Sequence, residues 1–152
     1  MITEQLIMNA LEKDNYQPFL NHFPYSKTMG LEVVSLGKKL IYKLPARPEH
    51  IGNTVLPAIH GGCIGGFMES AASFHIMLTL KHTHYPKIID ISIDYLRSGR
   101  DIDTFAECTI VRHGRKIVNV SIMAWQVEYE KSIANARINF LLASDTQEPQ
   151  SK

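Results

Sequence analysis

The sequence predicts an α+β fold in which one long buried helix packs against an antiparallel sheet of about six strands. Three patterns lead to this prediction. The only long helical pattern, residues 62–80, is apolar around nearly its whole circumference, as in a helix that other structure encloses. A hairpin pattern precedes this helix, and four strand patterns separated by turn signals follow it. A helix and a sheet that cover each other's apolar faces form a two-layer α+β architecture.

Length, charge and cysteine content bound the possible functions. A chain of 152 residues predicts a single domain over 1–152. The formal net charge of +1 argues against a nucleic-acid or membrane-surface partner. The start of the chain does not resemble a signal peptide, and the two cysteines then indicate reduced thiols in a cytoplasmic protein. No apolar run approaches the roughly 18 residues that indicate a membrane span.

The elements before the buried helix differ in clarity. Residues 2–13 have apolar positions at helical spacing and predict a short helix, the main part of an N-terminal helical segment over 1–29. The remainder of that segment contains two prolines, which leaves an irregular path or a second short helix. Residues 31–45 predict a hairpin, and residues 46–59 predict a loop.

The strands after the buried helix are predicted at 88–96, 104–111, 116–128 and 132–142. Because short turns separate them, we expect an antiparallel meander. A long helix wrapped by such a sheet is the hotdog arrangement. Residues 145–152 predict a polar tail.

Candidate chemistry gathers at the start of the buried helix, where His60-Gly61-Gly62 leads into it. The first turn of a helix has unpaired N–H groups and a positive dipole end, so it can stabilise a carbonyl oxygen that gains negative charge. Glu69 is the only carboxylate of the helix, and it lies about 10 Å beyond Gly62 at 1.5 Å per residue. A site assembled from two subunits would bring such donors and a carboxylate together more easily than one helix can.

Five segments follow one another in a characteristic order: Pro24-Tyr25-Ser26-Lys27-Thr28-Met29-Gly30-Leu31, Ile51-Gly52-Asn53, His60-Gly61-Gly62 through Glu69-Ser70-Ala71-Ala72, Ile89 to Arg97 and Arg112-His113-Gly114-Arg115. Over about residues 22–143, these motifs resemble the PaaI-like hotdog thioesterases of the 4-hydroxybenzoyl-CoA thioesterase superfamily. The histidine-glycine-glycine unit with an acid nine residues after the histidine is the most specific part.

This resemblance implies an enzyme that hydrolyses a small-to-medium or aromatic acyl-CoA to free acid and coenzyme A, without a metal or organic cofactor. It implies a homodimer or homotetramer with active sites at the subunit interface. Gly61 or Gly62 would polarise the thioester carbonyl through its N–H, and Glu69 would act as nucleophile or as general base toward water. His60 and Asn53 would shape the site.

The chain departs from the family pattern at three positions. Many relatives have aspartate where this chain has Glu69, which leaves nucleophile and general base open. Some relatives hold water with a serine or threonine where this chain has Ile88, and Ser70 or Ser92 are the candidate substitutes. The family's asparagine usually lies one residue closer to the histidine than Asn53 does.

Substrate contacts are predicted at further positions. Arginine binds phosphate well, so the basic residues at strand ends are either coenzyme A ligands or a solvated rim. These basic residues are Arg97, Arg100, Arg112, Arg115 and Lys116. Ser70 and Tyr95 are further substrate-binding candidates. The length of the acyl pocket is expected to depend on Phe67, Met68, Phe74 and Tyr95.

Other interpretations assign the same residues differently. Glu69 could be a structural acid paired with a buried arginine such as Arg97, and the two glycines could serve only close packing. Cys63 in the first helical turn could be a nucleophile assisted by His60, although such cysteines are more often packed as small hydrophobes. The three histidines His75, His82 and His84 do not have a recognised metal spacing.

Two other functions compete with hydrolysis. A hotdog protein that binds acyl-CoA without catalysis would have the same motifs. A hydratase or dehydratase is the weaker alternative, because that chemistry usually needs an aspartate paired with a histidine and no such pair is evident here.

Overall fold

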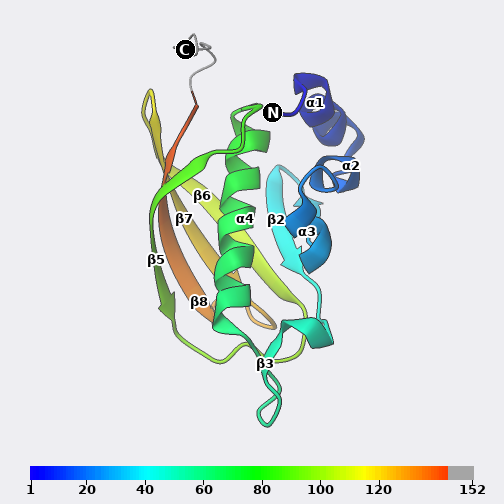
Figure 1. The fold of residues 1–152 in the computed structure, drawn as a ribbon, viewed down its shortest axis with the longest axis vertical. Helices are drawn as coiled ribbons and strands as arrows, with labels where there is room; N and C mark the ends of the chain where they lie inside the picture. The colour runs from blue at the N-terminus through cyan, green and yellow to red at the C-terminus, as the bar shows by residue number, and fades with distance from the viewer. Residues whose placement is uncertain (144–152) are drawn as a thin grey trace, which may run out of the picture.

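The computed structural model describes residues 1–143, and the predicted polar tail at 145–152 lies outside the described residues. The chain begins with three helices, α1 (Glu4–Lys13), α2 (Gln17–Leu20) and α3 (Pro24–Met29). The prediction of a helix in 2–13 is confirmed, and the segment after it forms two short helices, each with a proline in its first turn. These helices lie beside β2 and α4 in Figure 1.

The predicted six-stranded antiparallel sheet is confirmed. Its strands are β1 (Glu32–Leu36), β2 (Lys39–Leu44), β5 (Lys87–Tyr95), β6 (Thr104–His113), β7 (Ile117–Trp125) and β8 (Ala134–Leu141), in the order β1-β2-β6-β7-β8-β5. The first two form the predicted hairpin.

The predicted four-strand meander is wrong in one strand. Only β6, β7 and β8 follow one another as neighbours, whereas β5 pairs with β8 and forms an edge of the sheet. The residues between β5 and β6 carry the chain past the beginning of α4 and across the ends of β8 and β7 (Figure 1). The burial pattern agrees with this position: β7 buries every second residue, but most β5 side chains are exposed, as expected at an edge.

The predicted loop over 46–59 contains regular structure. A 3₁₀ turn, η1 (Pro48–His50), is followed by a small hairpin of β3 (Ile51–Asn53) and β4 (Ala58–Ile59). The N–H of His60 donates to the carbonyl of His50 at 2.8 Å, and the N–H of Ile59 donates to the carbonyl of Gly99 at 2.8 Å. These bonds fix the direction in which the chain enters the following helix.

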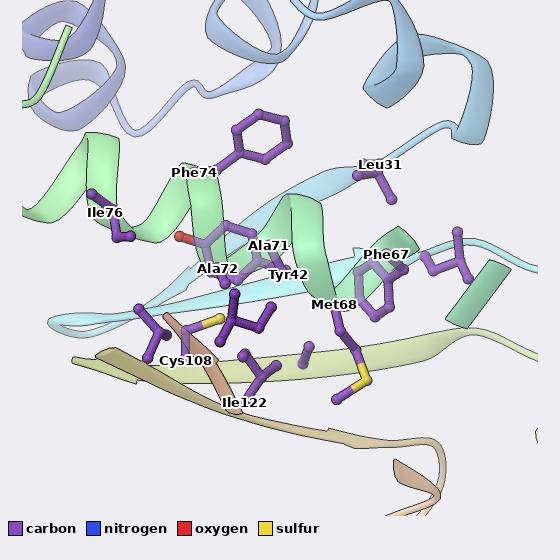
Figure 2. Close-up of a cluster of buried hydrophobic side chains, with 14 of the residues drawn as sticks. Leu31, Tyr42, Phe67, Met68, Ala71, Ala72, Phe74, Ile76, Cys108 and Ile122 are labelled. Carbon is purple, nitrogen blue, oxygen red and sulfur yellow. The ribbon is translucent and has the colours of Figure 1, made fainter. Parts of the chain in front are cut away.

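Helix α4 (Gly61–Thr79) confirms the predicted buried helix and crosses the face of the sheet (Figure 1). Figure 2 shows Met68 and Ala72 pointing toward Ile122 and Cys108 of the sheet, whereas Phe74 points toward the N-terminal helices. Large buried side chains of this kind contribute about 1.5–3 kcal/mol each, so this contact is a main source of stability.

The same packing bears on the acyl pocket. Phe67, Met68 and Phe74 are each at most 1% exposed, and Phe74 packs against Phe19 and Phe23 with ring centroids 5.5 and 4.9 Å away. These side chains therefore form part of the buried core of this chain. Over residues 1–143, no helix is long and apolar enough to cross a membrane.

Candidate active site

The start of α4 is organised by His60, the N-cap residue. Its Nδ1 accepts the N–H of Gly62 at 2.9 Å, and its carbonyl accepts the N–H groups of Cys63 and Ile64 at 2.9 and 3.1 Å. Within the described part of the chain, no acceptor occupies the N–H of Gly61. Of the two predicted glycine donors, Gly61 is therefore the one whose N–H remains open to a ligand.

Tyr95 and Arg97 lie beside this first turn. The Tyr95 hydroxyl donates to the carbonyl of Gly61 at 2.7 Å, and a hollow of about 360 Å³ next to it is lined by Gly61, Ile64, Tyr95 and Arg97 among others. The Arg97 side chain is exposed and donates to the carbonyl of Ser132 at 2.6 Å. The pairing of Glu69 with Arg97, the example given for a buried arginine, is thus wrong, because Arg97 is neither buried nor directed at that carboxylate.

Glu69 lies two turns into α4 and is partly buried. Burial raises the pKa of its carboxyl above the ordinary value. Among the described residues, no cation forms an ion pair with it. Helical side chains lean toward the N-terminus of their helix, so this carboxylate lies over the preceding turn, which contains Gly65 and Gly66. An unpaired acid therefore borders a stretch of helix that has no side chains.

Two tyrosines that the sequence interpretation did not single out face Glu69. Burial raises the pKa of Tyr25 in α3, and the charges of Cys63 and Glu69 raise it further. Burial also raises the pKa of Tyr85, on the connection after α4, and the Glu69 charge contributes there as well. Both phenols therefore lie within electrostatic range of the acid. Neither tyrosine has a sequence motif of its own. The only indication in the sequence is Gly66, because a glycine inside a helix suggests that another group packs closely against α4 at that position.

Asn53 is not brought to Glu69. It is exposed at the end of β3, and its Oδ1 accepts the N–H groups of Val55 and Leu56 at 3.0 and 3.1 Å. This asparagine therefore holds the turn between β3 and β4.

Ser70 and Ser92, the two candidate substitutes for the family's water-holding serine, lie in different parts of the structure. Ser70 is 3% exposed and its side chain interacts with the Tyr85 hydroxyl. Ser92 lines a hollow with Ser121 and Arg137, next to Asp94 of its own strand. It alternates with Ile93, whose Cδ1 approaches Gly65 of α4, so Ser92 points away from the helix. Only Ser70 lies near the candidate site.

Arg112 and Arg115 do not lie near the start of α4. With Lys116 they line a cleft of about 480 Å³ at the turn between β6 and β7. The strand register places this turn level with Lys87, at the end of β5 opposite to Tyr95. Eight residues of strand correspond to about 26 Å at 3.3 Å per residue. One chain therefore brings Arg97, but not Arg112 or Arg115, to the start of α4.

The remaining chemical alternatives find little support in the geometry. Burial raises the pKa of the Cys63 thiol, which lowers the thiolate fraction that a nucleophile needs. His75 shares a hydrogen bond of 3.2 Å with the Tyr42 hydroxyl, and burial lowers its pKa to about 4. The rings of His82 and His84 are 5.9 Å apart, and in residues 1–143 no group of three or more His, Cys, Asp or Glu side chains is placed to hold a metal ion.

Comparison with known proteins identifies the family. The sequence profile of the thioesterase superfamily matches residues 56–133. Medium/long-chain acyl-CoA thioesterase YigI of Escherichia coli K12 is 26% identical over 141 residues, which cover 82% of this chain and 88% of that protein.

Solved structures agree with this assignment. The crystal structure of a Chromobacterium violaceum protein is 38% identical, with a TM-score of 0.71 and coverage of 93% of this chain and 99% of that one. A Haemophilus influenzae thioesterase, 18% identical, has the same fold with a TM-score of 0.76 over 88% of this chain and 94% of that one. The chain therefore belongs to the thioesterase superfamily, has its hotdog fold, and is an enzyme that hydrolyses thioesters.

Proposed function

We propose that this thioesterase hydrolyses acyl-CoA to free acid and coenzyme A, with Glu69 as the catalytic carboxylate and the N–H of Gly61 as a donor to the thioester oxygen. The observation that carries this proposal is the unpaired, partly buried Glu69 above the glycines of α4. A partly buried acid without a cation is unfavourable for stability alone, which makes a functional reason the better explanation.

In the proposed reaction Glu69 is a general base. It accepts a proton from water while the water oxygen attacks the thioester carbon, and the carbonyl oxygen gains negative charge that the Gly61 N–H stabilises. The intermediate then expels the coenzyme A sulfur, which takes the proton from Glu69 as the carbon–sulfur bond breaks. A carboxyl whose pKa is raised holds protons more strongly than an ordinary one, which suits it to accept and return this proton.

The proposed substrates have acyl groups of small to medium length or aromatic acyl groups. The similarity to a medium/long-chain acyl-CoA thioesterase supports the medium-chain part of this range. The basic cleft of Arg112 and Arg115 is the proposed place of the coenzyme A phosphates, and Arg97 is a further candidate beside Gly61. Ser70 and Tyr95 complete the proposed substrate contacts.

We propose that the active enzyme is a homodimer formed through the β5 edges. Strand β5 has one free edge, and its isoleucines Ile89 and Ile91 are 52% and 40% exposed. Such an edge pairs readily with another strand. Gly61 and Glu69 are about 12 Å apart along α4 at 1.5 Å per residue, a distance that a second subunit would bridge with its own Glu69 or Gly61.

Within one chain, Arg112 and Arg115 lie far from Gly61, at the other end of the sheet. Antiparallel pairing of two β5 strands would bring them closer to the Gly61 of the second subunit. A two-fold axis near the middle of β5 would set the Tyr95 end of one strand level with the Lys87 end of the other. Since the Arg112 and Arg115 cleft is level with Lys87, it would then lie toward the partner's Gly61. The basic cleft of one subunit would thus serve the active site of the other.

The function is tested with a panel of acyl-CoA thioesters. We expect thiol release above background, with the highest kcat/KM for one of the short, medium-chain or aromatic acyl groups. Thiol release is followed with a chromogenic disulfide, and heat-denatured enzyme gives the background rate. Absence of turnover across short, medium, long and aromatic acyl groups would exclude the proposed reaction.

The dimer is tested by changing Ile91 to aspartate. A charge on each of two paired edges repels and cannot be buried, so we expect a monomer with at least a tenfold loss of activity. Light scattering after size exclusion measures the mass and also separates dimer from tetramer. The matched control is Val34→Asp on β1, the other edge strand, where the side chain is 39% exposed. An active Ile91→Asp monomer would contradict the two-subunit site.

We also propose the cytoplasm as the compartment. Cys63 and Cys108 are both free thiols, which is the usual state of cysteines in a reducing compartment.

A further inference from the structure

Tyr25 of α3 approaches α4 at Gly66. A Cβ atom at Gly66 would collide with the Tyr25 hydroxyl oxygen, and Cε1 and Cζ of the same ring are each 3.3 Å from that position. All three nearest contacts of this position belong to Tyr25. Glycine inside a helix costs about 1 kcal/mol relative to alanine, so a glycine there calls for a packing reason. The phenolic hydroxyl is that reason.

The position of Gly66 places this hydroxyl next to Glu69. Residues three apart on a helix are neighbours, with about 5–6 Å between their Cβ positions. The Glu69 side chain also leans toward the N-terminus of α4, and thus toward Gly66. The raised pKa of Tyr25, to which burial contributes most and then the charges of Cys63 and Glu69, agrees with this proximity.

The other polar groups near Tyr25 and Glu69 are less suited to bind the carboxylate. Cys63 has a weakly donating thiol, and burial raises its pKa. The Tyr85 hydroxyl interacts with the side chains of Ser73 and Ser70. The Tyr25 hydroxyl forms no hydrogen bond with any of the other described residues, Glu69 included, and the residue is 54% exposed. Its donor is therefore free to bind a nearby acceptor.

We infer that Tyr25 is a positioning residue whose free hydroxyl donates a hydrogen bond to the Glu69 carboxylate during the reaction, and that Gly66 is glycine to leave room for this hydroxyl beside the acid. The inference rests on the proposed catalytic role of Glu69. The bond holds the carboxylate in one orientation toward the attacking water. Because it binds the charged form, it also opposes the rise in pKa that burial causes and keeps more of the acid ionised near neutral pH.

The first test is Tyr25→Phe, which removes one oxygen atom and keeps the ring. Loss of a hydrogen bond to a charged group corresponds to about a 10- to 100-fold fall in kcat, with KM little changed. The acidic limb of the pH–rate profile should move to higher pH by about one unit, because the carboxylate loses a partner that favours ionisation. A purely structural role of Tyr25 would not move this limb.

The second test is Gly66→Ala, which keeps the hydroxyl but displaces it. Alanine favours the helix, so we expect an unchanged or higher melting temperature together with lower kcat and the same shift of the acidic limb. In the double variant Tyr25→Phe/Gly66→Ala, the two effects should not add, because the alanine then has no hydroxyl to displace. Fully additive losses would indicate two unrelated defects and overturn the link between the two residues.

The matched control is Tyr129→Phe. This change removes a phenol that donates to a carboxylate, Glu107 Oε2 at 2.7 Å, away from α4. We expect unchanged activity and an unchanged pH profile. A Tyr25→Phe enzyme with wild-type kcat and acidic limb, or with lower kcat but an unmoved limb, overturns the inference. Failure of the wild-type enzyme to release thiol from any acyl-CoA would instead overturn the proposed function.

Discussion

Replacing Glu69 by glutamine is expected to lower kcat by about 10²- to 10⁴-fold, the usual contribution of a positioned general base. Stability should stay the same or rise. Burial raises the pKa of this acid in the folded protein, so its ionisation destabilises the fold as pH rises through that pKa. A neutral amide of the same shape avoids this penalty. Steady-state thiol release and thermal unfolding at pH 7 measure the two effects.

The pH dependence of the wild-type enzyme provides an independent check of Glu69. The acidic limb of kcat/KM should lie above the ordinary carboxyl pKa of 4.5, in the direction that burial imposes. The matched control is Glu107→Gln, where hydrogen bonds from Lys39 and Tyr129 hold the carboxyl pKa below its ordinary value. That variant should keep its activity and its pH profile. Full activity of Glu69→Gln would rule out the proposed role.

Replacing Gly61 by proline is expected to lower kcat by about 10²- to 10³-fold, the effect of losing one oxyanion donor. Proline lacks the N–H but is favoured at the first position of a helix, where the N–H has no helical partner. It also requires an extended preceding residue, and His60 has φ −60° and ψ 130°. The change therefore removes the proposed donor at little cost to the helix.

Gly61→Ala is the matched control, because alanine keeps the N–H. Its Cβ would lie 3.5 Å from Cε1 of Tyr95, an ordinary van der Waals contact. We expect near-wild-type kcat for alanine and a large loss for proline, with similar melting temperatures for both. Equal activity of the two variants would show that the Gly61 N–H does not take part in the reaction.

Local patterns predicted most of the fold. The apolar circumference of α4 and the alternation along β6 and β7 depend on neighbouring residues, so the sequence contains them directly. The partner of β5 does not follow from such patterns. Its run of isoleucines is typical of a buried central strand, yet it forms an exposed edge of this chain. Which strands pair depends on the path of the whole chain, and a second subunit would hide the same isoleucines.

In the candidate site, too, the local part could be predicted from the sequence and the part that depends on tertiary packing could not. His60, Gly61 and Glu69 belong to one helix and its cap, so their spacing in the sequence nearly determines their spacing in space. Tyr25 comes from a helix more than 30 residues earlier, and only the packing of α3 on α4 brings it to Gly66. Within one chain, the predicted arginines separate because the register of the sheet, rather than their chemistry, decides which end they occupy.

The glycines at the start of α4 have a consequence for engineering. Four of the first six helical residues are glycine, and helix propensity alone would recommend alanine at each, at about 1 kcal/mol per position. In the proposed mechanism that gain would be opposed by lost activity wherever the missing side chain makes room for Tyr25 or for substrate. Stability and catalysis would then compete within two turns of one helix, so a thermostable variant of this enzyme is better sought on its sheet than on its central helix.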